Sequence, residues 1–108
     1  MAYPKFKDGE QVFLLPNIPL SRRTEKVTAY QPSLVLDCHA KRREFNGAYY
    51  SYYFVIPPGE QVTILSHDDF GYIVKVNRLS ETLCHRICIR CKSNELAKLD
   101  EHKHMVAV

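Results

Sequence analysis

The apolar residues of this chain fall in short runs that predict β-strands. Each run is rich in Val, Ile, Leu, Tyr or Phe, and turn-forming Pro, Gly, Asn or Asp residues bound it. The spacing typical of amphipathic helices is weak before residue 93. Strands are therefore predicted at 11–15, 33–39, 48–56, 60–66, 71–77 and 84–91.

The connections between these strands differ in character. Residues 16–32 contain three prolines, which have no amide hydrogen to give to a strand ladder, so this segment is predicted to be a long irregular loop. Residues 41–47 are predicted to be a hairpin connection, because Asn46-Gly47 favours the positive φ of a tight turn.

The C-terminal part of the chain is predicted to contain a short helix at 93–99. Ser93 is a suitable N-cap residue, and Leu96 and Leu99 would lie on one face of the helix, where they could close the open end of a barrel. Residues 101–108 are predicted to be a frayed tail.

One heptapeptide occurs twice in the chain, fifty positions apart. Residues 9–15 read GEQVFLL and residues 59–65 read GEQVTIL. The repeat predicts one small β-unit used twice, with 9–56 and 59–91 as equivalent halves. Three strands are too few to close a barrel, so the halves are expected to share one core within a single compact domain, 1–108.

The segment FKDGEQV at residues 6–12 resembles the opening of Tudor, chromo-barrel and related SH3-like modules. These modules often begin with an aromatic residue, a polar pair, a glycine, an acidic residue and a β-branched residue. The resemblance implies a mainly β fold, either an SH3-like small barrel or two fused SH3-like half-repeats, with the short C-terminal helix added. It also implies a general role in binding, without indicating the ligand.

Composition and charge narrow the class of protein. The chain has 108 residues, of which 45% are apolar and 25% charged, as in ordinary globular domains. The net charge of +3 is smaller than the excess that marks a dedicated nucleic-acid-binding protein. The N-terminal segment has no apolar stretch of a secretory signal, and no apolar run could span a bilayer. A cytoplasmic location is expected, with no membrane partner.

The densest aromatic segment lies in the strand predicted at 48–56. Strand alternation places Tyr50, Tyr52 and Phe54 on one face and Tyr49 and Tyr53 on the other. Phe54 has no polar atom and is the most costly of these rings to expose, so its face is predicted to enter the core. The opposite face is predicted to present tyrosines to a partner, although a plain barrel strand with cross-strand aromatic pairs is the alternative.

The predicted binding surface combines tyrosines with cations from two loops. Its members are Tyr49, Tyr53, Tyr72, Arg22, Arg23, Lys41, Arg42 and Arg43, with Tyr30 as a further contributor. Tyrosine anchors suit a protein or peptide partner. Tyrosines beside phosphate-binding cations suit nucleic acid, which is the alternative partner.

Two other groups of residues are of types that bind metals or catalyse acid–base reactions. Cys88-x2-Cys91 could be half of a zinc site, completed by Cys84 or by Cys38 and His39. On a strand, however, residues three apart point to opposite faces, which favours buried thiols over ligands.

The segment His67-Asp68-Asp69 contains acid–base residue types, but no nucleophile accompanies it, and the spacing suits a turn. The sequence therefore predicts no catalytic residues, no metal, no cofactor and no enzyme. It predicts a non-catalytic binding module that recognises a protein or peptide through a tyrosine-rich surface.

Overall fold

The computed structural model of the chain describes residues 5–98 and is mainly β, as predicted. The larger of two antiparallel sheets contains β7 (Cys88–Cys91), β6 (Gly71–Val76), β5 (Gln61–Asp68), β1 (Gln11–Leu14) and β8 (Leu96–Ala97), in that spatial order. The smaller sheet contains β2 (Thr24–Ala29), β4 (Tyr50–Val55) and β3 (Arg42–Phe45), again in spatial order.

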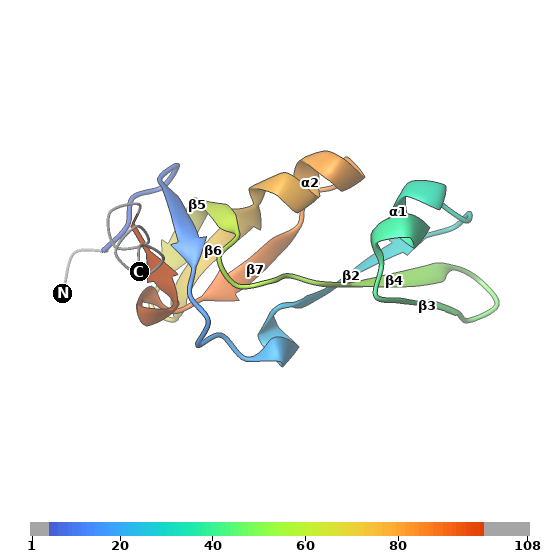
Figure 1. Cartoon of the computed structure of the whole chain (residues 1–108), viewed down its shortest axis with the longest axis horizontal. Coiled ribbons are helices and arrows are strands. Elements are labelled where there is room, and N and C mark those ends of the chain that lie inside the picture. The colour runs from blue at the N-terminus through green and yellow to red at the C-terminus, as the bar shows by residue number, and fades with distance from the viewer. Residues whose placement is uncertain (1–4, 99–108) are drawn as a thin grey trace.

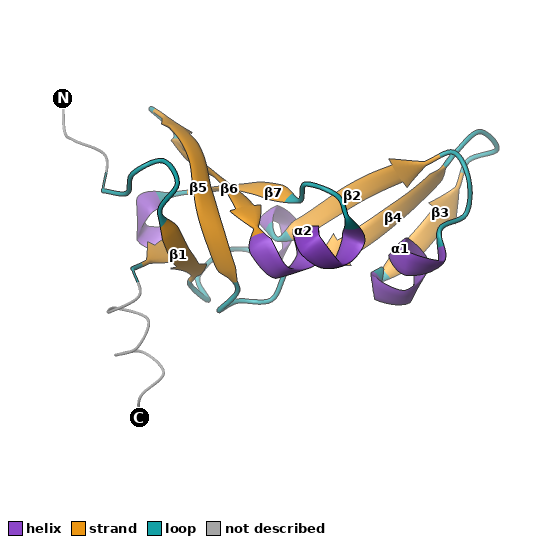
Figure 2. Cartoon of the chain, turned by 90° about the horizontal axis from the view of Figure 1, so that it is seen from above, coloured by secondary structure: helices purple, strands orange, loops and turns teal. Residues whose placement is uncertain are grey.

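The two sheets lie at opposite ends of an elongated molecule with extents of 47 × 36 × 22 Å (Figure 1). Two helices accompany them. Helix α1 (Leu34–His39) packs on the smaller sheet, and α2 (Asn77–Leu83) lies between the two ends of the molecule (Figure 2). Two 3-10 turns, η1 (Leu20–Arg22) and η2 (Ser93–Glu95), precede β2 and β8.

The core of the larger sheet follows from the alternation of buried and exposed residues along β1, β6, β7 and the first part of β5. Val12 and Leu14 of β1, Val62 and Ile64 of β5, and the corresponding positions of β6 and β7 are buried, whereas the residues between them are not. The sheet curls around this apolar face and buries it without a second sheet beneath it.

The repeated heptapeptide forms a local two-fold arrangement, because its two copies pair with one another. Strands β1 and β5 are antiparallel neighbours with Val12 opposite Val62. The amide of Gly9 donates to the Ile64 carbonyl at 2.6 Å, and the amide of Gly59 donates to the Leu14 carbonyl at 2.8 Å. The predicted equivalence of 9–56 and 59–91 holds for the repeated strands β1 and β5 and does not extend to the elements after them. The chain continues from β1 into the smaller sheet, whereas β5 turns directly into β6.

The prediction of a strand at 33–39 is wrong, because these residues form α1. The Ser33 hydroxyl accepts a hydrogen bond from the Leu36 amide at 3.2 Å and so caps the helix. Leu36 is buried, while Leu34 and Val35 remain exposed. An apolar run that buries one residue in three fits a short helix on a sheet better than a strand.

The predicted loop 16–32 also contains regular structure. Its segment Thr24–Ala29 is strand β2, which pairs with β4 along its whole length. The three prolines lie outside that segment, so they do not interrupt the ladder. Likewise, part of the predicted connection 41–47 is strand β3, and the tight turn predicted at Asn46-Gly47 follows it, with the Asn46 side chain accepting the amides of Ala48 and Tyr49.

Two predictions near the C-terminus are corrected as well. The predicted strand 84–91 is a strand only at Cys88–Cys91, because α2 precedes it and ends at Cys84 in a left-handed conformation with φ of 55°. The predicted helix 93–99 is the single turn η2 followed by β8, in which Leu96 is buried. Leu99 and the predicted tail 101–108 lie outside the described residues.

Candidate functional site

The smaller sheet has two different faces, and β4 sets them. Tyr52 and Phe54 are fully buried, which confirms the predicted core face for these two residues, while Tyr50 is half-buried. The Tyr52 hydroxyl accepts the Ser33 amide at 2.9 Å, which fixes the start of α1 on the sheet. Tyr53 lies on the opposite face and is partly exposed.

Two pairs of aromatic side chains lie at the end of this sheet that is farther from the larger sheet. We call this group the aromatic tip; it consists of Tyr30, Phe45, Tyr49 and Tyr50. The Tyr30 and Tyr49 rings are 6.3 Å apart and edge-to-face, and the Phe45 and Tyr50 rings are 4.6 Å apart.

The aromatic tip is unusually exposed for such large side chains. Tyr30 is 84% exposed and Phe45 is 58% exposed. Leu34 and Val35 at the start of α1 add exposed apolar surface, and the helix begins at the same end of the sheet because residues 30–33 connect it to β2. Exposed apolar side chains concentrated at one end of a sheet, as opposed to scattered single ones, are typical of a surface that a partner covers.

The cations of β3 are balanced by neighbouring acids. The Arg42 guanidinium lies 3.9 Å from the centre of the Tyr53 ring and forms an ion pair with Glu44. Arg43 forms an ion pair with Asp37 of α1 at 3.3 Å and lies 5.6 Å from the centre of the Tyr50 ring. The preceding Lys41 is exposed and gives its backbone amide to the Tyr53 carbonyl. The aromatic tip is thus bordered by nearly neutral surface.

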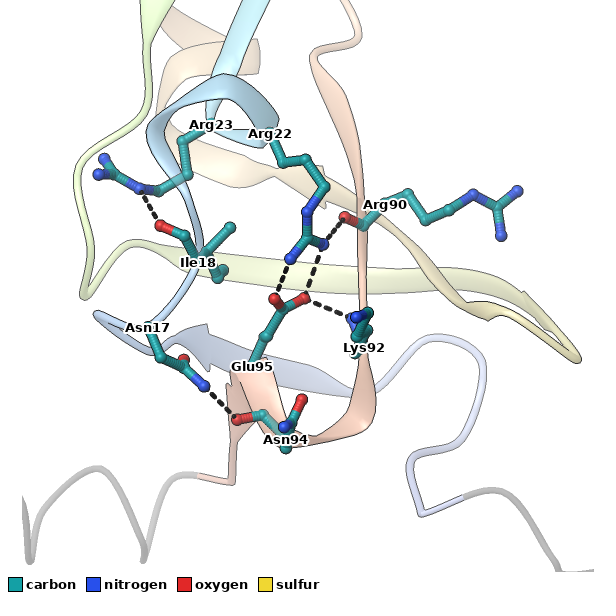
Figure 3. Close-up of polar contacts among 8 residues, drawn as sticks. All are labelled: Asn17, Ile18, Arg22, Arg23, Arg90, Lys92, Asn94 and Glu95. Atoms are coloured by element: carbon teal, nitrogen blue, oxygen red, sulfur yellow. Dashed lines mark hydrogen bonds and ion pairs between the residues drawn. The ribbon is translucent and has the colours of Figure 1, made fainter.

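Arg22 and Arg23, which were predicted to join 41–43 in a basic patch, are engaged with acceptors of the protein itself (Figure 3). Arg22 forms a two-pronged ion pair with Glu95, with Nη1 to Oε1 at 2.8 Å. Arg23 donates to the carbonyls of Ile18 at 3.1 Å and Ile56 at 2.7 Å. Both guanidinium groups satisfy acceptors at the junction of the two sheets, so they stabilise the fold.

Glu95 is a buried acid that sequence reasoning did not single out. It is 4% exposed and also accepts the Lys92 amide at 2.7 Å. Burial alone would raise the pKa of its carboxyl, but the hydrogen bonds from Arg22 and the Lys92 amide outweigh burial and lower that pKa. Its partner is 73 positions away in the chain, so no local motif pointed to the pair.

Tyr72 is a core residue, and its predicted place on the binding surface is wrong. It is 5% exposed and its ring meets that of Phe6 edge-to-face at 5.4 Å. Its hydroxyl accepts the amides of Lys5 at 2.8 Å and Phe6 at 3.3 Å. The polar end of a buried tyrosine needs such partners, and here they attach the N-terminal segment to β6.

The cysteines differ widely in exposure. Cys38 and Cys84 are exposed, Cys88 is partly buried and Cys91 is buried. Burial and the nearby Glu95 carboxylate raise the pKa of the Cys91 thiol to about 12. Within residues 5–98, no three His, Cys, Asp or Glu side chains form a group that could hold a metal ion.

The predicted turn after β5 is formed by residues 68–71. Asp68 accepts the Phe70 amide at 2.8 Å and forms an ion pair with Arg90 at 2.7 Å. The hydrogen bond from Arg90, followed by the one from the Phe70 amide, lowers the pKa of Asp68. His67 lies 3.3 Å from Asp8 on the exposed surface. Asp68 therefore stabilises the turn, and His67 forms a surface pair with Asp8.

Phe45 is the member of the aromatic tip that sequence reasoning missed, because its segment was assigned to a loop. The segment Arg42–Phe45 contains one apolar residue and all four of its side chains are exposed, so no local alternation marked it as a strand.

Comparisons with family models, with curated proteins and with solved structures found no match for this chain. Among the described residues, no helix is long and apolar enough to cross a membrane.

Proposed function

We propose that this chain is a non-catalytic binding module that recognises another protein through the aromatic tip. The observation that carries the proposal is the exposure of Tyr30 and Phe45 beside Tyr49 and Tyr50, at the end of a sheet that extends away from the main core. Clustered aromatic anchors bordered by arginines are typical of the energetic centre of protein interfaces. The partner would contact the Tyr30–Tyr49 pair and the Phe45–Tyr50 pair, which lie at the ends of β2 and β3 on either side of β4.

The charge around the aromatic tip favours a protein over a nucleic acid. Residues 24–55 contain four Lys and Arg against three Asp and Glu. Both arginines of β3 have acidic partners, and Arg22 and Arg23 are engaged at the sheet junction. A surface that follows a phosphate backbone needs a row of uncompensated cations.

The proposal includes an SH3-like arrangement of the larger sheet. Strand β1, a long connection, strand β5 and a hairpin to β6 follow the order typical of small SH3-like barrels. In this chain the long connection contains the whole three-stranded sheet and α1. The larger sheet would then serve as the scaffold, and its insertion would carry the recognition surface.

The test is capture of partners from a native lysate by the intact chain and by two matched variants. Tyr30→Ala combined with Phe45→Ala removes the most exposed rings of the aromatic tip. Phe70→Ala is the control, because Phe70 is 81% exposed but lies on the β5–β6 turn at the other end of the molecule. We expect the double variant to lose partners that the control retains, with or without nuclease. Partners that nuclease releases, or that both variants bind equally, would contradict the proposal.

A further inference from the structure

A second surface, on the larger sheet, carries a different kind of site. An open hollow of about 660 Å³ lies between the outer face of this sheet and α2 with the loop that follows it. Its floor contains the cross-strand row Gln11, Thr63 and Lys75, which are opposite one another on β1, β5 and β6. This volume is within the range of about 300–1,000 Å³ typical of small-molecule sites.

Three cations from different segments line the hollow. Lys75 comes from β6, Arg78 from α2 and Arg86 from the loop before β7. None of the three forms an ion pair with another residue in the range 5–98, unlike Arg22, Arg42, Arg43 and Arg90. Glu81 is the one acid of the lining. Three cations against one acid leave the lining with an excess of positive charge, which a bound anion would offset.

The remaining lining groups offer neutral hydrogen bonds. The Thr63 hydroxyl donates to Asn77 Oδ1 at 2.7 Å, which leaves the Asn77 amide nitrogen to donate elsewhere. The His85 Nδ1 lies 2.8 Å from the Leu83 carbonyl, which fixes that ring at the edge of the hollow. A ligand that combines charged oxygens with further polar groups fits this lining better than a simple inorganic anion.

We infer that the hollow binds a phosphate-bearing small molecule of about nucleotide size, with its phosphates at Lys75, Arg78 and Arg86. Arginine and lysine are the side chains that bind phosphate oxygens most strongly, by charge-assisted hydrogen bonds. The site lies on the larger sheet and does not use the aromatic tip, so it is independent of the protein-binding function proposed above.

The cysteines of the chain provide a direct test. Cys84 is exposed and lines the hollow, whereas Cys38 is exposed on α1 and lies outside it. Alkylation of the native chain by iodoacetamide would be followed at both thiols by mass spectrometry. The added compounds are ADP, pyrophosphate, inorganic phosphate, adenosine and a single-stranded oligonucleotide. We expect ADP to slow the alkylation of Cys84 severalfold, pyrophosphate to slow it less, and neither compound to change Cys38, while adenosine has no effect.

Calorimetric titration with ADP gives a second measurement. Arg78→Gln and Arg86→Gln should each weaken binding by about tenfold, because each removes a charged hydrogen-bond donor. The matched control, Lys41→Gln, removes an exposed cation of the smaller sheet and should leave the affinity unchanged. Equal protection of Cys84 by adenosine, stronger protection by the oligonucleotide, or no protection by any compound would each overturn the inference, and these outcomes need only the unaltered chain.

Discussion

Arg22 and Glu95, 73 positions apart in the chain, form a two-pronged ion pair that joins the entrance of the smaller sheet to the last turn of the larger one (Figure 3). Arg22 belongs to η1, which leads into β2, and Glu95 belongs to η2, which leads into β8. The Arg22 Nη1 also lies 3.5 Å from the Arg90 carbonyl of β7. One guanidinium therefore links three segments of the fold.

Removal of Arg22 should destabilise the protein, because Glu95 would remain buried without its counter-ion. We expect Arg22→Ala to lower the free energy of unfolding by roughly 1–3 kcal/mol, less than for a fully buried pair since Arg22 is partly exposed. Urea unfolding measures the change. Arg42→Ala is the control, because its ion pair with Glu44 is exposed and should contribute less than about 1 kcal/mol. An equal loss in both variants would contradict the structural role of Arg22.

The same pair predicts how stability depends on pH. The pKa of Glu95 in the folded protein is lower than its ordinary value of 4.5, which describes the unfolded chain. The ionised Glu95 carboxylate therefore stabilises the folded protein fully when the pH is above the unfolded pKa of 4.5. This stabilisation is lost as the pH falls through the lower pKa of Glu95 in the folded protein. Unfolding of the natural chain and Glu95→Gln would be compared between about pH 3 and pH 7. The stability difference should be constant near neutral pH and shrink in acid; a difference that grows in acid would refute this.

Adjacent residues of β4 should respond oppositely to truncation. Phe54 is buried in the core, so Phe54→Ala should lower the free energy of unfolding by about 3–5 kcal/mol. Tyr53 lies on the open face beneath Arg42, so Tyr53→Ala should cost less than about 1 kcal/mol. Thermal unfolding of the two variants, side by side, gives the comparison. If Tyr53→Ala unfolds the chain and Phe54→Ala does not, the assignment of faces is inverted.

The two-fold unit formed by the repeat predicts equal effects at its two glycines. Gly9 and Gly59 have φ of 86° and 88°, and an added Cβ would meet no atom within 4 Å at either site. The cost of Gly9→Ala and of Gly59→Ala is then backbone strain alone, about 1–2 kcal/mol each. Chemical denaturation of both variants measures it. A large difference between the two costs would show that the symmetry is limited to hydrogen bonding.

Several features of this protein follow from local sequence. The alternation of buried and exposed residues in β5 and β6 reflects the two-residue period of a strand, so their existence and their buried faces were predictable. The same period placed Tyr52 and Phe54 inside. The turn at Asn46-Gly47 was also predictable, because its conformation depends on the side chains of the turn itself.

Other features were decided by partners far away in the chain. The polar segment Thr24–Ala29 becomes strand β2 because β4 offers it a complete ladder, and nothing within the segment identifies that partner. The run Leu34-Val35-Leu36 suits a strand or a helix, and packing of Leu36 on the smaller sheet selects the helix.

Local patterns thus determined where strands could form and which faces could be buried, because alternation and turn chemistry act between near neighbours. Tertiary structure decided that Arg22 stabilises the fold while the aromatic tip remains exposed. A guanidinium group suits a solvated loop, a phosphate site or a buried ion pair equally well in sequence. Only the approach of Glu95, brought near by the pairing of β8 with β1, selects the ion pair.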